Sequence, residues 1–428
     1  MKGTWTRLLA AGCFLAGSLI APVAALAQGV AAPGSAGSGA ASAQQGAVTA
    51  LPRPVFELQA GGGVTWDSNP FLLSSSVDPQ AQLGTSDKSD TITSAFVGVN
   101  IDKLYSLQHF YLDATETTYR HSNFSLLNFD AFQYRGGWDW RLGTRLSGTL
   151  SADRSQALVN YADFRNTTQR NVVTTEHRLA SLDGWVSGGW HALLAATQVV
   201  SENSVPFIQQ GSYRLTGGDG GIKYLAQSGS SVELHAASAN GDYLDQPLDP
   251  VNLIDDGFRR TESYVKASLP FSAKSTLDGR LGWVDYRNNH FGQRDFSGTV
   301  GTLGYLWRPT ERLSFTLLAS RDRVPYVADT SSYVVNDTVS LAPSWTLSPK
   351  TALIFTLSQT ASDFGGAVVT SSAPLRHDDL SSAQLALKWT PLRSVTVNAS
   401  LRHLRQSSNT AGFDYKDDIA SVNASVLF

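Results

Sequence analysis

The side chains that most often carry catalysis or bind metal ions are few in this chain and stand far apart. Its eight histidines form no His-x-x-x-His pair of the kind that binds zinc on a helix. They are His109, His121, His177, His191, His235, His290, His377 and His403. No Gly-x-Ser-x-Gly sequence sets a serine nucleophile on a sharp turn. This pattern favours a protein that is not an enzyme.

Two local features were candidates for chemistry. His377, Asp378 and Asp379 form a cluster of histidine and acid, but a catalytic histidine also needs a nucleophile placed beside it. We interpret this cluster as part of a solvated loop. Cys13 is the single cysteine, and it lies in an N-terminal segment that we expect to be removed. The mature chain is therefore expected to have no disulfide, no thiol chemistry and no cysteine-based metal site. We also expect no other metal site and no cofactor.

Charged side chains recur instead in alternation with apolar ones. Because successive side chains of a β-strand point to opposite faces, each such segment has one apolar wall and one polar wall. We expect the polar walls to line the lumen of a barrel whose apolar walls meet lipid. The predicted lumen-lining residues are Arg135, Asp139, Arg145, Asp153, Arg260, Glu262, Lys266, Asp278, Arg280, Lys388 and Arg402. Their mixed signs favour a generally polar channel over an ion-selective ring, and salt bridges that only stiffen the barrel would use the same residues.

Alternating segments fill the chain from residue 52 to its end. They are about 10–14 residues long, and no sustained helical period interrupts them. In 395–402, for example, valine, alanine and leucine alternate with threonine, asparagine, serine and arginine. Such segments, separated by turn residues, are the signature of a transmembrane β-barrel. We predict an all-β fold, an antiparallel up-and-down barrel in the outer membrane of a Gram-negative bacterium.

The connections between these segments alternate in length. Short joins are expected at 102–106, 143, 188–189, 227–230, 271–275, 308–312, 348–350 and 391–393. Longer polar connections are expected at 67–89, 122–128, 156–172, 202–211, 242–258, 288–294, 324–333, 363–377 and 407–414. This pattern predicts about 18 strands, with the short turns and both chain ends on the periplasmic side. The connections 67–89 and 156–172 are our candidates for folding inward and narrowing the barrel.

The first residues predict a secretory signal peptide. Lys2 and Arg7 begin it, an apolar stretch follows, and Ala25-Leu26-Ala27 gives the small-x-small pattern at which such peptides are cut. The apolar stretch is shorter than the roughly 20 residues of a spanning helix, which argues against a membrane anchor. We predict a signal peptide at 1–27, a flexible periplasmic tail rich in Gly, Ala, Ser and Gln at 28–51, and the barrel at 52–428.

The charge balance bears on partners. Without Lys2 and Arg7, 31 of the 33 basic residues remain beside 36 acidic ones, which gives the mature chain a net charge of −5. No run of basic residues indicates nucleic-acid binding. We therefore expect outer-membrane lipid as a partner and no nucleic acid.

Aromatic residues mark the ends of the predicted strands. Trp307, Trp345 and Trp389 each precede a turn that contains proline, and tryptophan favours the membrane interface, so we expect them in a periplasmic aromatic girdle. The last strand alternates apolar and polar residues and ends in Phe428. A terminal strand of this kind resembles the signal that the barrel assembly machinery recognises. It must also pair with the first strand, because lipid cannot satisfy an open sheet edge.

Several stretches resemble a known family. Residues 66–71, Trp-Asp-Ser-Asn-Pro-Phe, resemble the Asp-x-Asn-x-Phe opening of the Putative beta-barrel porin family. Residues 151–156 and 161–164, the stretch 169–176, and Tyr-Arg-Leu-Thr at 213–216 are similar to its EpsL-like branch, which is found beside polysaccharide and exosortase systems. The resemblance implies an outer-membrane component of exopolysaccharide production and transfers no catalytic residue.

Three functions stay open at this point. The main expectation is a conduit for exopolysaccharide export, with periplasmic and inner-membrane synthesis and export proteins as partners. The alternative is a porin for passive or substrate-specific diffusion of small hydrophilic solutes, because a barrel of this strand number is wide enough to hold water. The third is a structural or adhesive barrel whose long loops bind partners.

Overall fold

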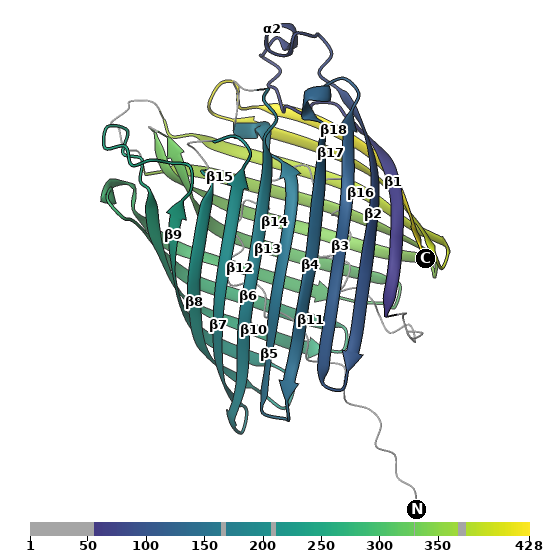
Figure 1. Cartoon of the computed structure of the whole chain (residues 1–428), viewed down its shortest axis with the longest axis vertical. Helices are drawn as coiled ribbons and strands as arrows, with labels where there is room; N and C mark the ends of the chain where they lie inside the picture. The colour runs from purple at the N-terminus through teal and green to yellow at the C-terminus, as the bar shows by residue number, and fades with distance from the viewer. Residues whose placement is uncertain (1–54, 164–167, 207–210, 329, 367–373) are drawn as a thin grey trace, which may run out of the picture.

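In its described part, the chain forms one closed sheet of eighteen antiparallel strands (Figure 1). The computed structural model describes residues 55–163, 168–206, 211–328, 330–366 and 374–428. The predicted signal peptide (1–27) and periplasmic tail (28–51) lie outside these residues. Each strand pairs with its neighbours in sequence, and β1 also pairs with β18. The predicted up-and-down outer-membrane β-barrel is confirmed.

The elements have the following bounds. The strands are β1 (Phe56–Asp67), β2 (Asp90–Tyr105), β3 (Gln108–His121), β4 (Phe129–Leu142), β5 (Leu146–Leu158), β6 (Val172–Ser187), β7 (Trp190–Asn203), β8 (Tyr213–Leu225), β9 (Ser231–Tyr243), β10 (Gly257–Ser272), β11 (Ser275–Asn288), β12 (Phe296–Trp307), β13 (Leu313–Ala328), β14 (Ser331–Ser348), β15 (Thr351–Gly365), β16 (His377–Leu392), β17 (Val395–Ser408) and β18 (Tyr415–Leu427). The described helices are α2 (Pro79–Leu83), η2 (Ser125–Leu127), η3 (Tyr161–Asp163) and η4 (Gly292–Arg294). No helix among the described residues is long and apolar enough to cross a membrane.

The barrel closes where the last strand meets the first. β1 and β18 pair from Gln59 opposite Leu427 to Asp67 opposite Ile419. The Phe428 N–H donates to the Leu58 carbonyl at 2.8 Å, and the Leu58 N–H donates to the Phe428 carbonyl at 3.3 Å. Lipid offers no hydrogen-bond partners, so this seam satisfies two strand edges that would otherwise stay unpaired.

One face of each strand carries large apolar side chains that no other part of the protein covers. Val97, Leu194, Leu281 and Leu401, on four different strands, are 60–67% exposed. Soluble monomers rarely expose so extended an apolar surface. These side chains form the band that meets lipid, and the residues that alternate with them face the lumen.

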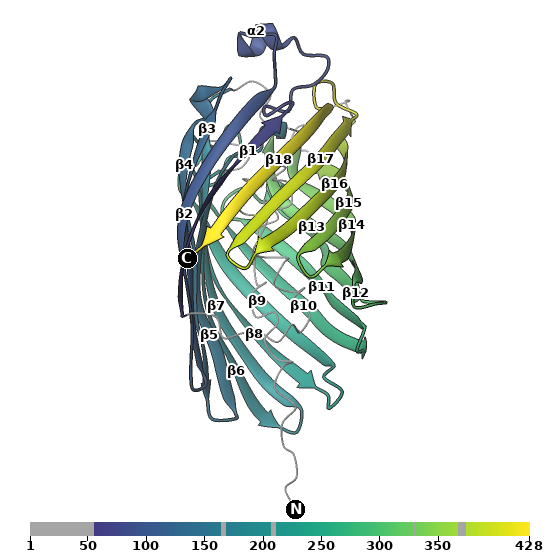
Figure 2. The same cartoon turned by 90° about the vertical axis from the view of Figure 1, so that its right-hand side faces the viewer.

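The connections alternate in length along the chain, and Figure 2 shows the strands inclined to the barrel axis. The residues between β2 and β3 are 106–107, whereas 68–89, with α2, join β1 to β2 at the opposite end (Figure 1). We call the end that carries the longer connections the loop end.

One expected connection proved to be wrong. Most of 324–333 is strand, because β13 continues to Ala328 and β14 begins at Ser331. The stretch was expected to be a connection because it falls among the longer polar segments. It contains Pro325, but the β12–β13 pairing ends at Gly301 and Arg321, so Pro325 lies where one strand edge is free of ladder bonds and proline is tolerated.

The three tryptophans of the predicted girdle lie on the outer face beside short turns. Trp307, Trp345 and Trp389 are 44%, 53% and 45% exposed. Trp307 also stacks on Phe315 of β13, with ring centroids 5.4 Å apart. Their placement agrees with a ring of interfacial side chains at the end opposite the loops.

The terminal ring can be tested apart from the terminal backbone. The Phe428 side chain is 75% exposed, while its backbone bonds to Leu58. Because Phe428→Ala keeps both backbone bonds, we expect the free energy of unfolding of the assembled barrel to change by less than about 0.5 kcal/mol. We expect the yield of assembled barrel to fall several-fold, measured as heat-modifiable protein in outer-membrane fractions. Val422→Ala, on the outer face of the same strand, is the control, and equal yields for the two variants would contradict the prediction.

Candidate functional site

The polar inner wall holds most of the predicted lumen residues. On β4 and β5, Arg135 stands directly opposite Asp153. Asp139 accepts a hydrogen bond from Thr149 Oγ1 at 2.7 Å and lies 3.4 Å from His109 Nδ1 on β3. The charges of this part of the wall therefore interact from strand to strand.

The densest group of charges lies on β9, β10 and β11. Glu262 sits between two arginines, with Arg260 at 2.9 Å and Arg280 at 2.6 Å. Its side chain is 2% exposed, so the two guanidinium groups offset the cost of removing the carboxylate from water. Lys266 reaches Glu233 at 3.4 Å. Two of the predicted residues, Arg260 and Arg280, thus meet around the carboxylate of a third, Glu262.

A histidine and a tyrosine, absent from the prediction, extend this group into a network. His235 Nδ1 lies 2.7 Å from Asp219, and its Nε2 lies 3.1 Å from Glu233. The Tyr264 hydroxyl donates to Asp219 at 3.1 Å, and its ring stacks on His235 with centroids 4.5 Å apart. The Arg280 guanidinium lies 4.1 Å from the centre of the Tyr264 ring. The network runs along the inner wall from β8 to β11.

Three other predicted residues also lie on the inner wall. Asp278 accepts a hydrogen bond from Ser268 Oγ at 2.6 Å. Arg402 Nε donates to Ser382 Oγ at 3.3 Å. Lys388 alternates with outward apolar residues of β16 and so faces the lumen.

Arg145 is the exception among the predicted lumen residues. It lies in the turn between β4 and β5, and its guanidinium packs 4.9 Å from the Trp185 ring. Gly143, with a φ of +61°, begins the turn and so ends the alternation on which the prediction rested.

Toward the loop end, aromatic rings replace charges on the inner wall. Phe258, Tyr286 and Phe296 stack in sequence, with 4.6 Å between centroids at each step. The Tyr243 and Tyr286 hydroxyl oxygens lie 3.0 Å apart, and Tyr333 lies 5.1 Å from Phe296. The three stacked rings are at most 6% exposed. They therefore act as packed wall, because their faces are not open to a solute.

The connection after β1 begins at a hydrogen-bonded hub, Asn69. Its Oδ1 accepts from the Leu73 N–H at 2.9 Å, and its Nδ2 donates to the Leu73 and Lys416 carbonyls at 2.9 and 3.0 Å. The Asn69 N–H donates to Asp67 Oδ1 at 2.8 Å. Asn69 is completely buried. The Asp-x-Asn motif thus fixes the direction in which the connection leaves β1.

Apolar residues after this hub turn back into the barrel. The Phe71 ring lies 5.0 Å from the rings of Phe124 and Tyr161, which belong to two other connections. Leu72 packs with Leu404, on the inner wall of β17, and both are nearly inaccessible to solvent. These contacts agree with the prediction that parts of the connections 67–89 and 156–172 fold inward.

An arginine links two connections that lie on nearly opposite sides of the closed strand order. Arg376, just before β16, lies 2.8 Å from Asp163 of the β5–β6 connection. Its Nε donates to Asp378 at 2.9 Å, and its guanidinium lies over the rings of Phe364 and Phe413 at 4.4 and 3.7 Å. The side chain is 10% exposed. We call Arg376 and Asp163 the latch, since they join connections across the mouth.

The latch and the hub were missing from the predicted site residues, although the sequence held a signal for each. Phe-Leu-Leu at 71–73 is an apolar run inside a polar connection, and such a run predicts packing. Asp163 lies in the 161–164 stretch of the family resemblance. Nothing in the sequence paired it with Arg376, because the two are distant along the chain.

One group among the described residues could supply three ligands to a metal ion: Asp255, Asp256 and His290. However, Asp255 already accepts hydrogen bonds from the N–H groups of His290 and Phe291 at 2.7 and 3.0 Å. The hydrogen bond with Asp255 raises the pKa of His290, so the pair is strongest when the imidazole is protonated and weakens as the pH rises through that pKa. We interpret the group as a clasp between two loop-end connections.

Several solved barrels are similar to the chain. OpdK of Pseudomonas aeruginosa, in a structure with vanillate, is 10% identical over 87% of this chain and 99% of that one, with a TM-score of 0.49. OccK2 (OpdF) of the same species, in complex with glucuronate, is 11% identical over 87% and 98%, with a TM-score of 0.49. OccAB4 of Acinetobacter baumannii is 10% identical over 88% and 99%, with a TM-score of 0.48.

By sequence, a family model matches only the C-terminal part of the chain. No curated protein matches it. The model of the family described as Putative beta-barrel porin 2 matches residues 267–428, from within β10 to the last residue.

The latch can be opened by one substitution. Arg376→Ala would leave buried Asp378 and half-buried Asp163 without their cation, a loss worth about 3 kcal/mol for a buried pair. We expect the connections to separate and the mean single-channel conductance in planar bilayers to rise about twofold, since such segments gate access. Arg287→Ala, which removes an exposed ion pair with Asp285 on the outer face, is the matched control. Wild-type conductance together with wild-type protease resistance at the mouth would refute the role of the latch.

Proposed function

We propose that this outer-membrane barrel is a channel for small hydrophilic solutes, narrowed at its loop end by inward-folded connections. The main observation that supports this proposal is the inner wall of β8–β11, where paired charges line a barrel of eighteen strands. Barrels of roughly 16–18 strands enclose water, whereas those of about eight are filled by side chains.

The exposure of the wall charges supports contact with water. The side chains of Lys266, Lys223 and Asp183 are 22%, 17% and 26% exposed, and Lys223 is paired with Asp183. Ionised groups at such positions are stable because water solvates what the ion pair leaves unsatisfied. A wall that is hydrated and balanced in charge favours polar solutes of low net charge over ions of one sign.

The mouth supports selection by size. Leu72 against β17 and Arg376 against Asp163 hold three connections in the path of a solute. A small molecule needs a modest displacement of these segments, whereas a polymer chain needs the three connections displaced together. The geometry therefore favours small solutes.

Exopolysaccharide export is the second candidate, and it rests on the motif resemblance. The motif residues Asp67, Asn69 and Phe71 form the hub and the packing that hold the first connection inward. The resemblance thus lies in the segment that would have to move for a polymer to pass.

Glu262 tests whether the inner wall is the solute path. Glu262→Gln leaves Arg260 and Arg280 without their shared carboxylate, so we expect the cation-to-anion permeability ratio to fall about threefold. Reversal potentials in a salt gradient across a planar bilayer measure this ratio, and liposome swelling measures the passage of neutral sugars. Asp285→Asn removes a carboxylate on the outer face and is the control. An equal cation-to-anion permeability ratio in Glu262→Gln and Asp285→Asn would argue against the inner wall as the solute path. Absence of conductance in the wild-type protein would argue against a channel.

A clean deletion separates the two candidates. Under the solute-channel proposal, we expect surface polysaccharide to be unchanged and the uptake of small polar solutes to be reduced. Periplasmic accumulation of polymer, with synthesis intact, would instead favour export.

A further inference from the structure

The backbone ladder between β12 and β13 covers only part of the two strands. Their pairing stops at Gly301 opposite Arg321. Both strands continue beyond this point, where β12 stays paired with β11 and β13 with β14. The wall therefore divides toward the loop end. We call the two facing stretches without a ladder, 296–300 of β12 and 322–328 of β13, the split.

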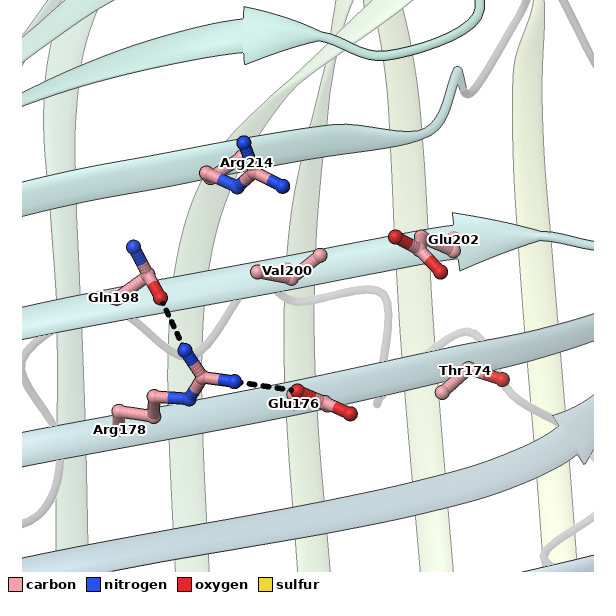
Figure 3. A pocket seen from close by; sticks show the side chains of 7 residues that line it. All are labelled: Thr174, Glu176, Arg178, Gln198, Val200, Glu202 and Arg214. Carbon is pink, nitrogen blue, oxygen red and sulfur yellow. Dashed lines mark hydrogen bonds and ion pairs between the residues drawn. The ribbon is translucent and has the colours of Figure 1, made fainter.

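Most of the wall is continuous to the loop end, as it is along β6, β7 and β8. The β6–β7 ladder, for example, reaches Val173 opposite Asn203. Figure 3 shows polar side chains on the outer face of this part, where Arg178 bonds with Glu176 and Gln198 at 3.1 and 2.9 Å. These side chains add to a wall that the backbone already closes.

The described barrel has one other interruption of this kind, between β4 and β5. Their pairing stops at Tyr134 opposite Arg154, and beyond it the Phe132 N–H donates to Gln156 Oε1 at 2.9 Å. Neither strand has a proline there, so every residue keeps an N–H with which a ladder could form. This interruption is therefore not imposed by the residues of either strand.

Between β12 and β13, a proline prevents the ladder from continuing. Extending the register from Gly301 and Arg321 would set Ser297 opposite Pro325. In a hydrogen-bonded antiparallel pair each residue donates its N–H to the carbonyl opposite, and proline has no N–H. The Ser297 carbonyl accepts instead from the Arg323 guanidinium at 2.8 Å. The split thus follows from the sequence of β13.

The Arg323 side chain fills the split. Its guanidinium lies 4.8 Å from the centre of the Tyr333 ring. A Cβ atom on Gly298 would lie 2.6 Å from Arg323 Cζ, so glycine is needed there to leave room for the guanidinium. Among the described residues Arg323 has no ion pair, and its buried Nε has no hydrogen-bond partner. Its hydrogen bond to Ser297 is therefore the main polar contact that it makes across the split.

Other side chains join the two sides closer to the loop end. Arg294, which precedes β12, donates to the Ala328 and Ser331 carbonyls at 3.0 and 3.2 Å. The Phe296 and Tyr333 ring centroids lie 5.1 Å apart across the split. Side chains thus hold the β13–β14 hairpin against β12 here, and a few such contacts separate more readily than a continuous ladder.

Outward residues of β11 show the level of the split in the membrane. Leu281, opposite Gly301, is 67% exposed and belongs to the apolar band. Trp283, opposite Thr299, is 54% exposed, and tryptophan favours the membrane interface. The split therefore begins where the apolar band meets the headgroup layer, and backbone groups without a ladder are tolerated there because water reaches them.

We propose that the split is a lateral gate, closed by Arg323, through which amphipathic molecules pass between the lumen and the leaflet at the loop end. Movement of the β13–β14 hairpin away from β12 uncovers the Phe296 ring, which is 6% exposed in the closed wall, and frees the Ser297 carbonyl beside it. An opening with an aromatic surface and a hydrogen-bond acceptor suits a molecule that has an apolar part and a polar part. This path through the wall goes beyond the solute channel proposed above.

A thiol on the inner wall tests whether the gate opens to lipid. Val300, 3% exposed at the lower end of the split, is replaced as Val300→Cys in the mature chain, which is expected to have no other cysteine. The probe is a phosphatidylethanolamine that carries a maleimide on its headgroup, in the vesicles that hold the protein. We expect Arg323→Ala to raise the rate of thiol modification about tenfold, because it removes a charged hydrogen bond across the split. Adding Pro325→Val should return the rate toward that of the wild type, because it restores an N–H opposite Ser297.

Two controls separate opening of the gate from general loosening of the barrel. Arg321→Ala removes an outward arginine that pairs with Asp337 on the same hairpin, and it should leave the rate unchanged. The alternative reporter Val199→Cys lies on β7, which is paired on both edges, and it should stay unmodified in every variant. Heat-modifiable migration confirms that each variant is folded.

The assay needs no flux through the lumen, so failure of the solute channel would leave it unaffected. Equal modification of Val300→Cys with and without Arg323→Ala would overturn the proposal. An equal increase at Val199→Cys would also overturn it, because the whole wall would then have loosened.

Discussion

Lipid supplies no hydrogen-bond partners to a protein backbone, and the rest of this structure depends on that constraint. It requires strand edges inside the hydrocarbon to be paired, and the β1–β18 seam meets this requirement. The β12–β13 pairing stops at Gly301 and Arg321. Beyond this point, side chains supply some of the hydrogen bonds that the backbone groups need. There the Arg323 guanidinium donates to the Ser297 carbonyl at 2.8 Å.

Closure of the sheet also limits where charged side chains can lie. Because one face of every strand contacts lipid, most charged side chains lie in the lumen or on the outer face near the loop end, beyond the apolar band. Inside the lumen, the desolvation of Glu262 is offset by Arg260 and Arg280, and that of Asp219 by His235 and Tyr264. The result is a wall that is strongly polar yet nearly neutral.

The mouth is built by a different principle, since its connections lie beyond the ladder of strand hydrogen bonds. The Asn69 side chain hydrogen-bonds the N–H and the carbonyl of Leu73, which have no strand partner. Apolar packing at Phe71 and Leu72 holds the connection inward. The Arg376 latch adds an ion pair between two aromatic rings. These contacts are made by side chains of the connections, outside the hydrogen-bond ladder that holds the barrel wall.

Sequence alone predicts about 18 strands, the closure of the barrel, and the face on which residues such as Arg135 and Glu262 lie, because alternation and connection length are local properties. The prediction failed at Arg145, where a turn ended the alternation, and at 324–333, where strand continues because an unpaired strand edge tolerates Pro325. Tertiary structure alone decided which charges meet, as with Arg376 and Asp163. Alternation assigns a side chain to a face, whereas its partner depends on the register of neighbouring strands and the paths of distant connections.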